Sequence, residues 1–170
     1  MKKLILIGAL SIMAISCQQN KIAFVDNTKL INEYQEKIDI EAKYKGKIEK
    51  FDKKTDSLSR AFQSEAQSFE AEAKSLPQSQ AQEKYNSLLQ KRQAMSQQLQ
   101  MEEQKLSQES QQEIDSLIKK VRTFVKDYGK EKGYTFVLGS NEAGSVLYGE
   151  ESKDITSEVL KEINEEYKSK

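Results

Sequence analysis

The stretch Leu76-Pro77-Gln78-Ser79 contains the only proline of the chain and separates two long segments with helical periodicity. Pro77 suits the first turn of a helix, because the backbone N–H that it lacks has no partner there. The residue before a proline is biased away from helical geometry, which ends the preceding helix at Leu76. We therefore predict two helices joined by a short turn near residues 76–79.

The segment before this turn carries a seven-residue apolar repeat. Its members are Ile48, Thr55, Phe62, Phe69 and Leu76. Phe51 and Leu58 fill the intervening position, and Glu65 and Glu72 then replace them. The seam between the helices is therefore expected to be apolar near its base and diluted towards the turn. From Tyr44 to the turn, this helix would be about 50 Å long.

The segment after the turn continues the pattern for longer. Apolar positions are Tyr85, Leu88, Met95, Leu99 and Leu106, then, shifted by one residue, Ile114, Leu117, Val121, Phe124 and Tyr128. Four charged residues interrupt them: Arg92, Glu102, Glu109 and Glu113. We predict a long antiparallel helical hairpin over residues 44–128, a coiled-coil arm without a tight, continuous seam.

The residues that flank the arm have a different pattern. Residues 22–25 form a short apolar run that predicts a buried strand, followed by a helix capped by Asn27 or Thr28. Residues 134–139 and 145–149 predict a β-hairpin, and a final helix begins near residue 154. The expected fold is α+β, predominantly α, with the arm inserted in a small body made of residues 22–43 and 129–170.

Such a body is small for a single core, and the chain has no cysteine pair to staple it. Assembly of several copies through the strands would stabilise it and cover its edges. The candidate assembly residues are Ile22, Phe24, Phe136, Leu138, Val146 and Tyr148.

The N-terminus has the pattern of a secretion signal. Residues 1–16 comprise two lysines, a short apolar run and small residues directly before Cys17. This arrangement is similar to a bacterial lipobox, which implies lipidation of Cys17 and a tether over residues 17–21; the alternative is an ordinary signal peptide with an incidental cysteine. Removal of residues 1–16 takes away Lys2 and Lys3 and leaves a slightly acidic chain, which excludes a strongly basic nucleic-acid-binding protein.

No catalytic, metal or cofactor site is predicted. The chain has no histidine and one cysteine, which removes the usual nucleophilic triads and most zinc sites. The glycine- and lysine-containing segment 129–133 precedes a strand, whereas a nucleotide-binding phosphate loop follows one. We expect neither an enzyme nor a nucleotide-dependent machine.

The arm carries the candidate binding residues. Phe62, Phe69, Leu76, Tyr85 and Met95 either pack within the seam or offer apolar contacts to a partner. Near the turn, four cations outnumber the single acidic residue Glu83 between residues 74 and 92: Lys74, Lys84, Lys91 and Arg92. They are either a solvated turn or a contact for anionic lipid or acidic partner segments.

The mature chain resembles the Skp/OmpH family of periplasmic chaperones. The resemblance lies in residues 21–26, in Tyr44-Lys45-Gly46-Lys47, and in residues 154–161, together with the order strand, helical hairpin, strands, helix. It implies a homotrimer whose arms surround a cavity and hold unfolded outer-membrane proteins in the periplasm without ATP. Well-known members are strongly basic and soluble, whereas this chain is slightly acidic and carries Cys17. The alternative function is a structural coiled-coil spacer or scaffold of the cell envelope.

Overall fold

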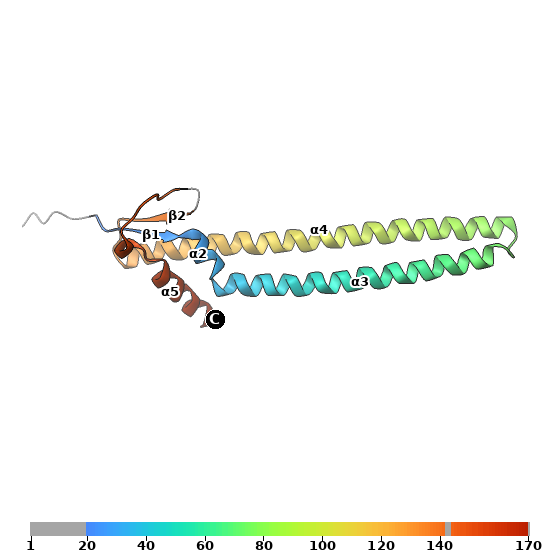
Figure 1. Ribbon diagram of the computed structural model, residues 1–170, viewed down its shortest axis with the longest axis horizontal. Helices are drawn as coiled ribbons and strands as arrows, with labels where there is room; N and C mark the ends of the chain where they lie inside the picture. The colour runs from blue at the N-terminus through green and yellow to red at the C-terminus, as the bar shows by residue number, and fades with distance from the viewer. Residues whose placement is uncertain (1–19, 142–143, 170) are drawn as a thin grey trace, which may run out of the picture.

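The computed structural model describes residues 20–141 and 144–169. A helical hairpin extends from a small body at one end, which contains both the strands and the C-terminal helix (Figure 1). In chain order the elements are β1 (Ile22–Asp26), α2 (Asn27–Asn32), α3 (Gln35–Ala73), α4 (Gln78–Glu131), β2 (Phe136–Ser140), the 3₁₀ turn η2 (Glu151–Lys153) and α5 (Thr156–Lys168). The predicted signal (residues 1–16) and lipidation site (Cys17) lie outside the described residues, as does the predicted tether up to residue 19.

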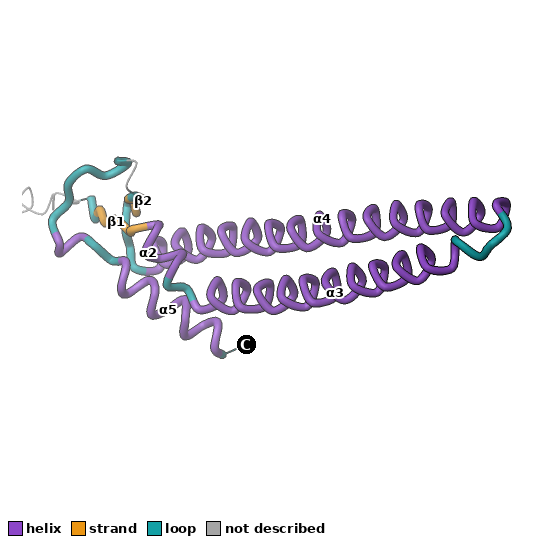
Figure 2. The backbone as a smooth tube through the Cα atoms, turned by 45° about the vertical axis from the view of Figure 1, so that its right-hand side comes forward, coloured by secondary structure: helices purple, strands orange, loops and turns teal. Residues whose placement is uncertain are grey.

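The arm consists of α3 and α4, which lie side by side along its length (Figure 2). The 54 residues of α4 correspond to about 80 Å at 1.5 Å per residue. Its partner α3 runs through Gly46 without interruption and ends at Ala73. The turn therefore occupies residues 74–77, and Pro77 precedes the first residue of α4 with extended backbone geometry. The predicted helical hairpin is confirmed.

The sheet of the described chain consists of β1 and β2 in parallel register, with Ile22 opposite Phe136 and Phe24 opposite Leu138. Parallel neighbours need a long crossover, and here the crossover is the whole arm. The predicted strand at residues 22–25 is confirmed, but only its alternate residues Ala23 and Val25 are buried.

The predicted β-hairpin was wrong in its second half, because residues 145–149, including Val146 and Tyr148, form no strand. The other edge of β1 is already occupied: the carbonyl of Phe24 accepts a hydrogen bond from the Ile155 N–H, 3.0 Å away, and Phe24 forms a bridge with Asp154. Residues 145–149 instead form an irregular loop that returns past the ring of Phe24, close to Gly149.

The core lies where the sheet, the base of α4 and α5 meet. It contains Ala23, Val25, Leu30, Tyr34, Leu117, Val121, Tyr128, Ile155, Val159 and Ile163. The helix predicted near residue 154 is α5, and its apolar residues at steps of four face this core, with Tyr167 edge-on to Tyr34 at 5.9 Å between ring centroids. The cap predicted at Asn27 or Thr28 was wrong by one or two residues: the carboxylate of Asp26 accepts the Lys29 N–H.

Candidate functional site: the helical arm

The seam of the arm is only half-buried beyond its base. Tyr44 is the buried residue of α3, and the buried residues of α4 begin at Leu117. From Tyr44 out to the turn, and back along α4 as far as Leu117, every described side chain of the seam retains contact with solvent. Apolar burial therefore holds the base of the arm firmly and its outer part weakly.

The predicted binding residues lie along this outer part. Phe62, Phe69, Leu76 and Met95 are half-buried, whereas Tyr85 is 48% exposed. The rings of Phe69 and Tyr85 lie 6.5 Å apart across the two helices and are tilted by 33°. Seam packing therefore accounts for part of their surface, and the remainder faces solvent.

Six ion pairs connect α3 to α4, and we call them the ion-pair ladder. From base to turn they are Glu36–Lys120, Lys43–Glu113, Lys47–Glu109, Lys54–Glu102, Glu65–Lys91 and Glu72–Lys84. In every pair the two residue numbers add up to the same value, so all six belong to one antiparallel register. The steps along α3 are 7, 4, 7, 11 and 7 residues, each close to a whole number of turns, which places the ladder on one flank of the arm.

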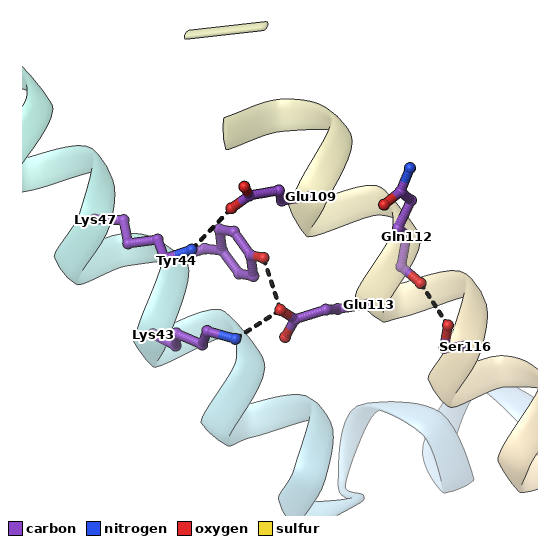
Figure 3. Close-up of polar contacts among 7 residues, drawn as sticks. All are labelled: Lys43, Tyr44, Lys47, Glu109, Gln112, Glu113 and Ser116. Atoms are coloured by element: carbon purple, nitrogen blue, oxygen red, sulfur yellow. Dashed lines mark hydrogen bonds and ion pairs between the residues drawn. The ribbon is translucent and has the colours of Figure 1, made fainter. Parts of the chain in front are cut away.

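Two rungs of the ladder lie beside Tyr44 at the root of the arm (Figure 3). The Tyr44 hydroxyl donates to Glu113 Oε1 at 2.8 Å, and Lys43 Nζ donates to the same oxygen at 2.6 Å. One turn along, Lys47 Nζ donates to Glu109 Oε2 at 2.9 Å and lies 4.6 Å from the centre of the Tyr44 ring. The buried ring thus backs two ion pairs at the root of the arm.

These contacts shift the acid–base behaviour of the cluster. Hydrogen bonds from Lys43 and then from Tyr44 lower the pKa of Glu113, and the bond from Lys47 lowers the pKa of Glu109. The bond to Glu109 raises the pKa of Lys47. Burial, followed by the bond to Glu113, raises the pKa of Tyr44. The cluster therefore keeps its charged form at neutral pH and has no group prepared for proton transfer.

Two of the four cations predicted near the turn form ion pairs with glutamates of the opposite helix. Lys84 pairs with Glu72 at 2.6 Å, and Lys91 pairs with Glu65. Both glutamates lie outside the 74–92 window from which the positive excess was counted. Within the described part of the chain, Lys74 and Arg92 have no ion pair. The predicted basic patch is thus reduced to two unpaired cations.

Sequence reasoning missed the ladder. It treated Glu65, Glu72, Glu102, Glu109 and Glu113 as residues that dilute or interrupt the seam, whereas each of them pairs with a lysine of the opposite helix. The sequence does contain this information: once the register of the hairpin is known, the partner in each ion pair is found by counting residues from the turn.

The predicted assembly residues form an uncovered apolar face on the sheet. Ile22, Phe136 and Leu138 are exposed, and Phe24 is half-buried. In the loop, Tyr148 is 86% exposed and the neighbouring Leu147 is 92% exposed, while Val146 is half-buried. These positions are consistent with contacts between copies.

Residues 20–141 and 144–169 contain no cluster of three or more His, Cys, Asp or Glu side chains that could hold a metal ion. None of the helices described in the structure has the length and apolar content needed to cross a membrane.

The family comparison gives a match over most of the chain. The family model described as OmpH, outer membrane protein (OmpH-like), matches residues 21–163. The chain belongs to the OmpH-like family. The family match thus includes the complete arm and most of the body.

Two relatives illustrate the similarity. Outer membrane protein 26 of Haemophilus influenzae (strain Rd) is 42% identical over 52 residues, which are 31% of this chain and 25% of that protein. The crystal structure of a "putative outer membrane chaperone (OmpH-like)" from Caulobacter crescentus CB15 superposes with a TM-score of 0.77 and covers 86% of this chain and 85% of that one. Its sequence identity is 14%, so this agreement concerns the fold.

Proposed function

We propose that this OmpH-like protein is a periplasmic holdase chaperone. It binds unfolded outer-membrane proteins between its helical arms and prevents their aggregation, without ATP. The observation that carries the proposal is the arm itself: the 39 residues of α3, about 60 Å, pair with α4 through a seam that is only half-buried beyond its base, and the hairpin extends away from the body. The family match and the chaperone description of the structural relative support it.

The outer seam suits a partner without a fixed shape. Phe62, Phe69, Leu76, Tyr85 and Met95 provide apolar surface that the arm does not fully bury. Many weak contacts on adaptable surfaces favour promiscuous binding over recognition of one folded shape. We assign these five residues to client contact, and the two unpaired cations Lys74 and Arg92 to attraction of acidic client segments or lipid headgroups.

The body would join three copies into a homotrimer. Support comes from the exposed sheet residues Ile22, Phe136 and Leu138, which no described element covers. A mass measurement by light scattering at micromolar concentration tests this: a trimer mass is expected, and a monomer mass contradicts it.

Cys17 would anchor the assembly to a membrane, with the body and arms in the periplasm. The support is the signal-like sequence of residues 1–16 directly before the cysteine. Intact-mass measurement of the protein purified from its native membranes is expected to show added acyl chains, and an unmodified mass rules the anchor out.

The holdase activity is tested by diluting an outer-membrane β-barrel protein out of urea with and without the mature protein, in the absence of nucleotide. Suppression of light scattering at near-stoichiometric ratio is expected. Tyr85→Ser should weaken suppression, whereas Ile38→Ser, at the root of the arm and 43% exposed, should not. No suppression at any ratio would reject the proposal.

A structural spacer of the cell envelope is the second candidate. The ion-pair ladder favours it, because six inter-helix pairs in one register stiffen a rod. Photo-crosslinking from Tyr85 distinguishes the two functions: a holdase yields many unfolded partners, and a spacer yields one folded partner.

A further inference from the structure

We propose that the ion-pair ladder is a register lock whose outer rungs control how far the arm opens. Its charge pattern changes along the arm. Near the body α3 supplies the lysines, Lys43, Lys47 and Lys54, and α4 supplies the glutamates. Beyond Lys54 the order is reversed, since Glu65 and Glu72 lie on α3. The lowest rung, Glu36–Lys120, is reversed as well.

A sign pattern that changes along the arm distinguishes the native register from its neighbours. A seam with a seven-residue repeat is prone to slip by one heptad, because such a slip keeps apolar residues facing each other. If one helix carried all the lysines of the ladder and the other all the glutamates, a slipped arm would still form attractive pairs. With signs that change along the arm, it loses half or more of them and brings like charges together at the base.

A slip by one heptad in the first direction pairs Glu36 with Glu113 and places Lys43 opposite Leu106. Repulsion thus replaces attraction at the base. Only two attractive pairs remain, Lys47–Glu102 and Glu65–Lys84.

A slip in the other direction pairs Lys43 with Lys120 and Glu36 with Asp127. Two like-charge contacts then arise at the base, and like charges at such contacts are destabilising. The remaining attractive pairs are Lys50–Glu113, Lys54–Glu109 and Glu72–Lys91. The native register is the one of these three in which every rung is attractive.

Burial of the ladder decreases from the base of the arm to its turn. At the base the ladder is backed by the buried ring of Tyr44 and by the core around Leu117. At the outer end, the charged groups of Glu72 and Lys84 are both more than half exposed, and the seam beside them is only half-buried. Exposed pairs are individually weak and are screened by salt. The outer rungs are therefore the first to break, and the arm opens from its turn towards its root.

This inference concerns the free protein and stands independently of holdase activity; if the holdase function holds, the outer rungs set the opening through which a client enters. The two are tested separately. Register and opening are measured on the mature protein without client, so a failed aggregation assay leaves the result intact.

Register is read by zero-length carbodiimide crosslinking at low salt, which joins a lysine to a carboxylate only when the two are in contact, followed by mass spectrometry. The expected intrachain crosslinks are those of the ladder, including Glu72–Lys84 and Glu65–Lys91. Crosslinks dominated by the slipped pairs Glu65–Lys84 or Glu72–Lys91 would overturn the assigned register.

Opening of the arm is measured as the hydrogen-exchange rate of the backbone amides in residues 66–73. Circular dichroism checks that the helical content of each variant is unchanged. Glu72→Lys places two ammonium groups together and should raise the exchange rate about threefold to tenfold. The double exchange Glu72→Lys with Lys84→Glu should restore the native rate. The control Glu70→Lys makes the same charge change on α3 at a residue without an ion pair in the described chain, and should leave the rate unchanged.

High salt should remove the difference between Glu72→Lys and the native protein, because at about 1 M the screening length falls to about 3 Å. If Glu72→Lys matches its Glu70→Lys control, or the double exchange fails to restore protection, the outer rungs do not hold the arm closed. If helicity is lost in Glu72→Lys, comparison of the double exchange with the native protein decides the same question.

Discussion

Two buried threonine hydroxyls have opposite surroundings, and the same substitution should therefore have opposite effects. Thr55 lies on α3 in the seam, and its covered hydroxyl has no hydrogen-bond partner among the described residues. Thr156 begins α5, and its hydroxyl oxygen accepts the Asp26 N–H at 2.8 Å and donates to the carboxylate of Asp154. Replacement by valine keeps the shape and the β-branch at both positions.

The magnitudes follow from hydrogen-bond accounting. A buried polar group without a partner costs about 1–3 kcal/mol, whereas removal of such a group in favour of a methyl group is neutral or stabilising. Thr55→Val should therefore raise the free energy of unfolding by about 1 kcal/mol. Thr156→Val leaves the Asp26 N–H without its acceptor next to β1, and should lower the free energy of unfolding by about 2 kcal/mol.

Urea unfolding followed by helical circular dichroism measures both variants at one fixed protein concentration, because assembly makes apparent stability concentration-dependent. An unchanged m-value shows that the midpoint shift reports stability. Destabilisation by Thr55→Val would mean that its hydroxyl has a partner, and would refute the reasoning.

Three further predictions use the same assay. Gly46→Ala should stabilise by about 1 kcal/mol, because Gly46 is inside α3 with open space around it, whereas Gly133→Ala should destabilise by a similar amount, because the φ angle of Gly133 is +71°; equal effects would contradict both assignments. Leu117→Ala should cost about 2–5 kcal/mol, since Leu117 is buried where the arm meets the core, and a cost below 1 kcal/mol would place the core elsewhere. Because folding lowers the pKa of Glu109 and Glu113, their stabilisation is complete above a pH of about 4.3 and is lost as the pH falls through the folded values. The double change of both residues to glutamine should flatten the stability profile in that range, and an unaltered profile would exclude this linkage.

The hairpin was predictable because its signals are local. The seven-residue repeat and Pro77 identify two helices and a turn without any knowledge of the body. The turn position was two residues late, since α3 ends at Ala73 and Leu76 belongs to the connection. Helix ends depend on capping contacts and are the least certain part of such a prediction.

The body was less predictable because its pairing is not local. Residues 145–149 have strand-like composition, but Asp154 and Ile155 occupy the edge of β1 that they would need. That choice depends on where α5 packs. Likewise, the glutamates of the seam reveal their partners only when both helices are placed in register.

The central claim is that the arms hold a client in an unfolded state. The direct measurement is to isolate the complex of the mature protein with an isotope-labelled outer-membrane β-barrel protein by size exclusion, and to record the NMR spectrum of the client. We expect a soluble complex, formed without nucleotide, in which client resonances have the narrow dispersion of an unfolded chain. A client that shows the dispersed spectrum of a folded barrel, or that does not co-elute with the protein, would contradict the account.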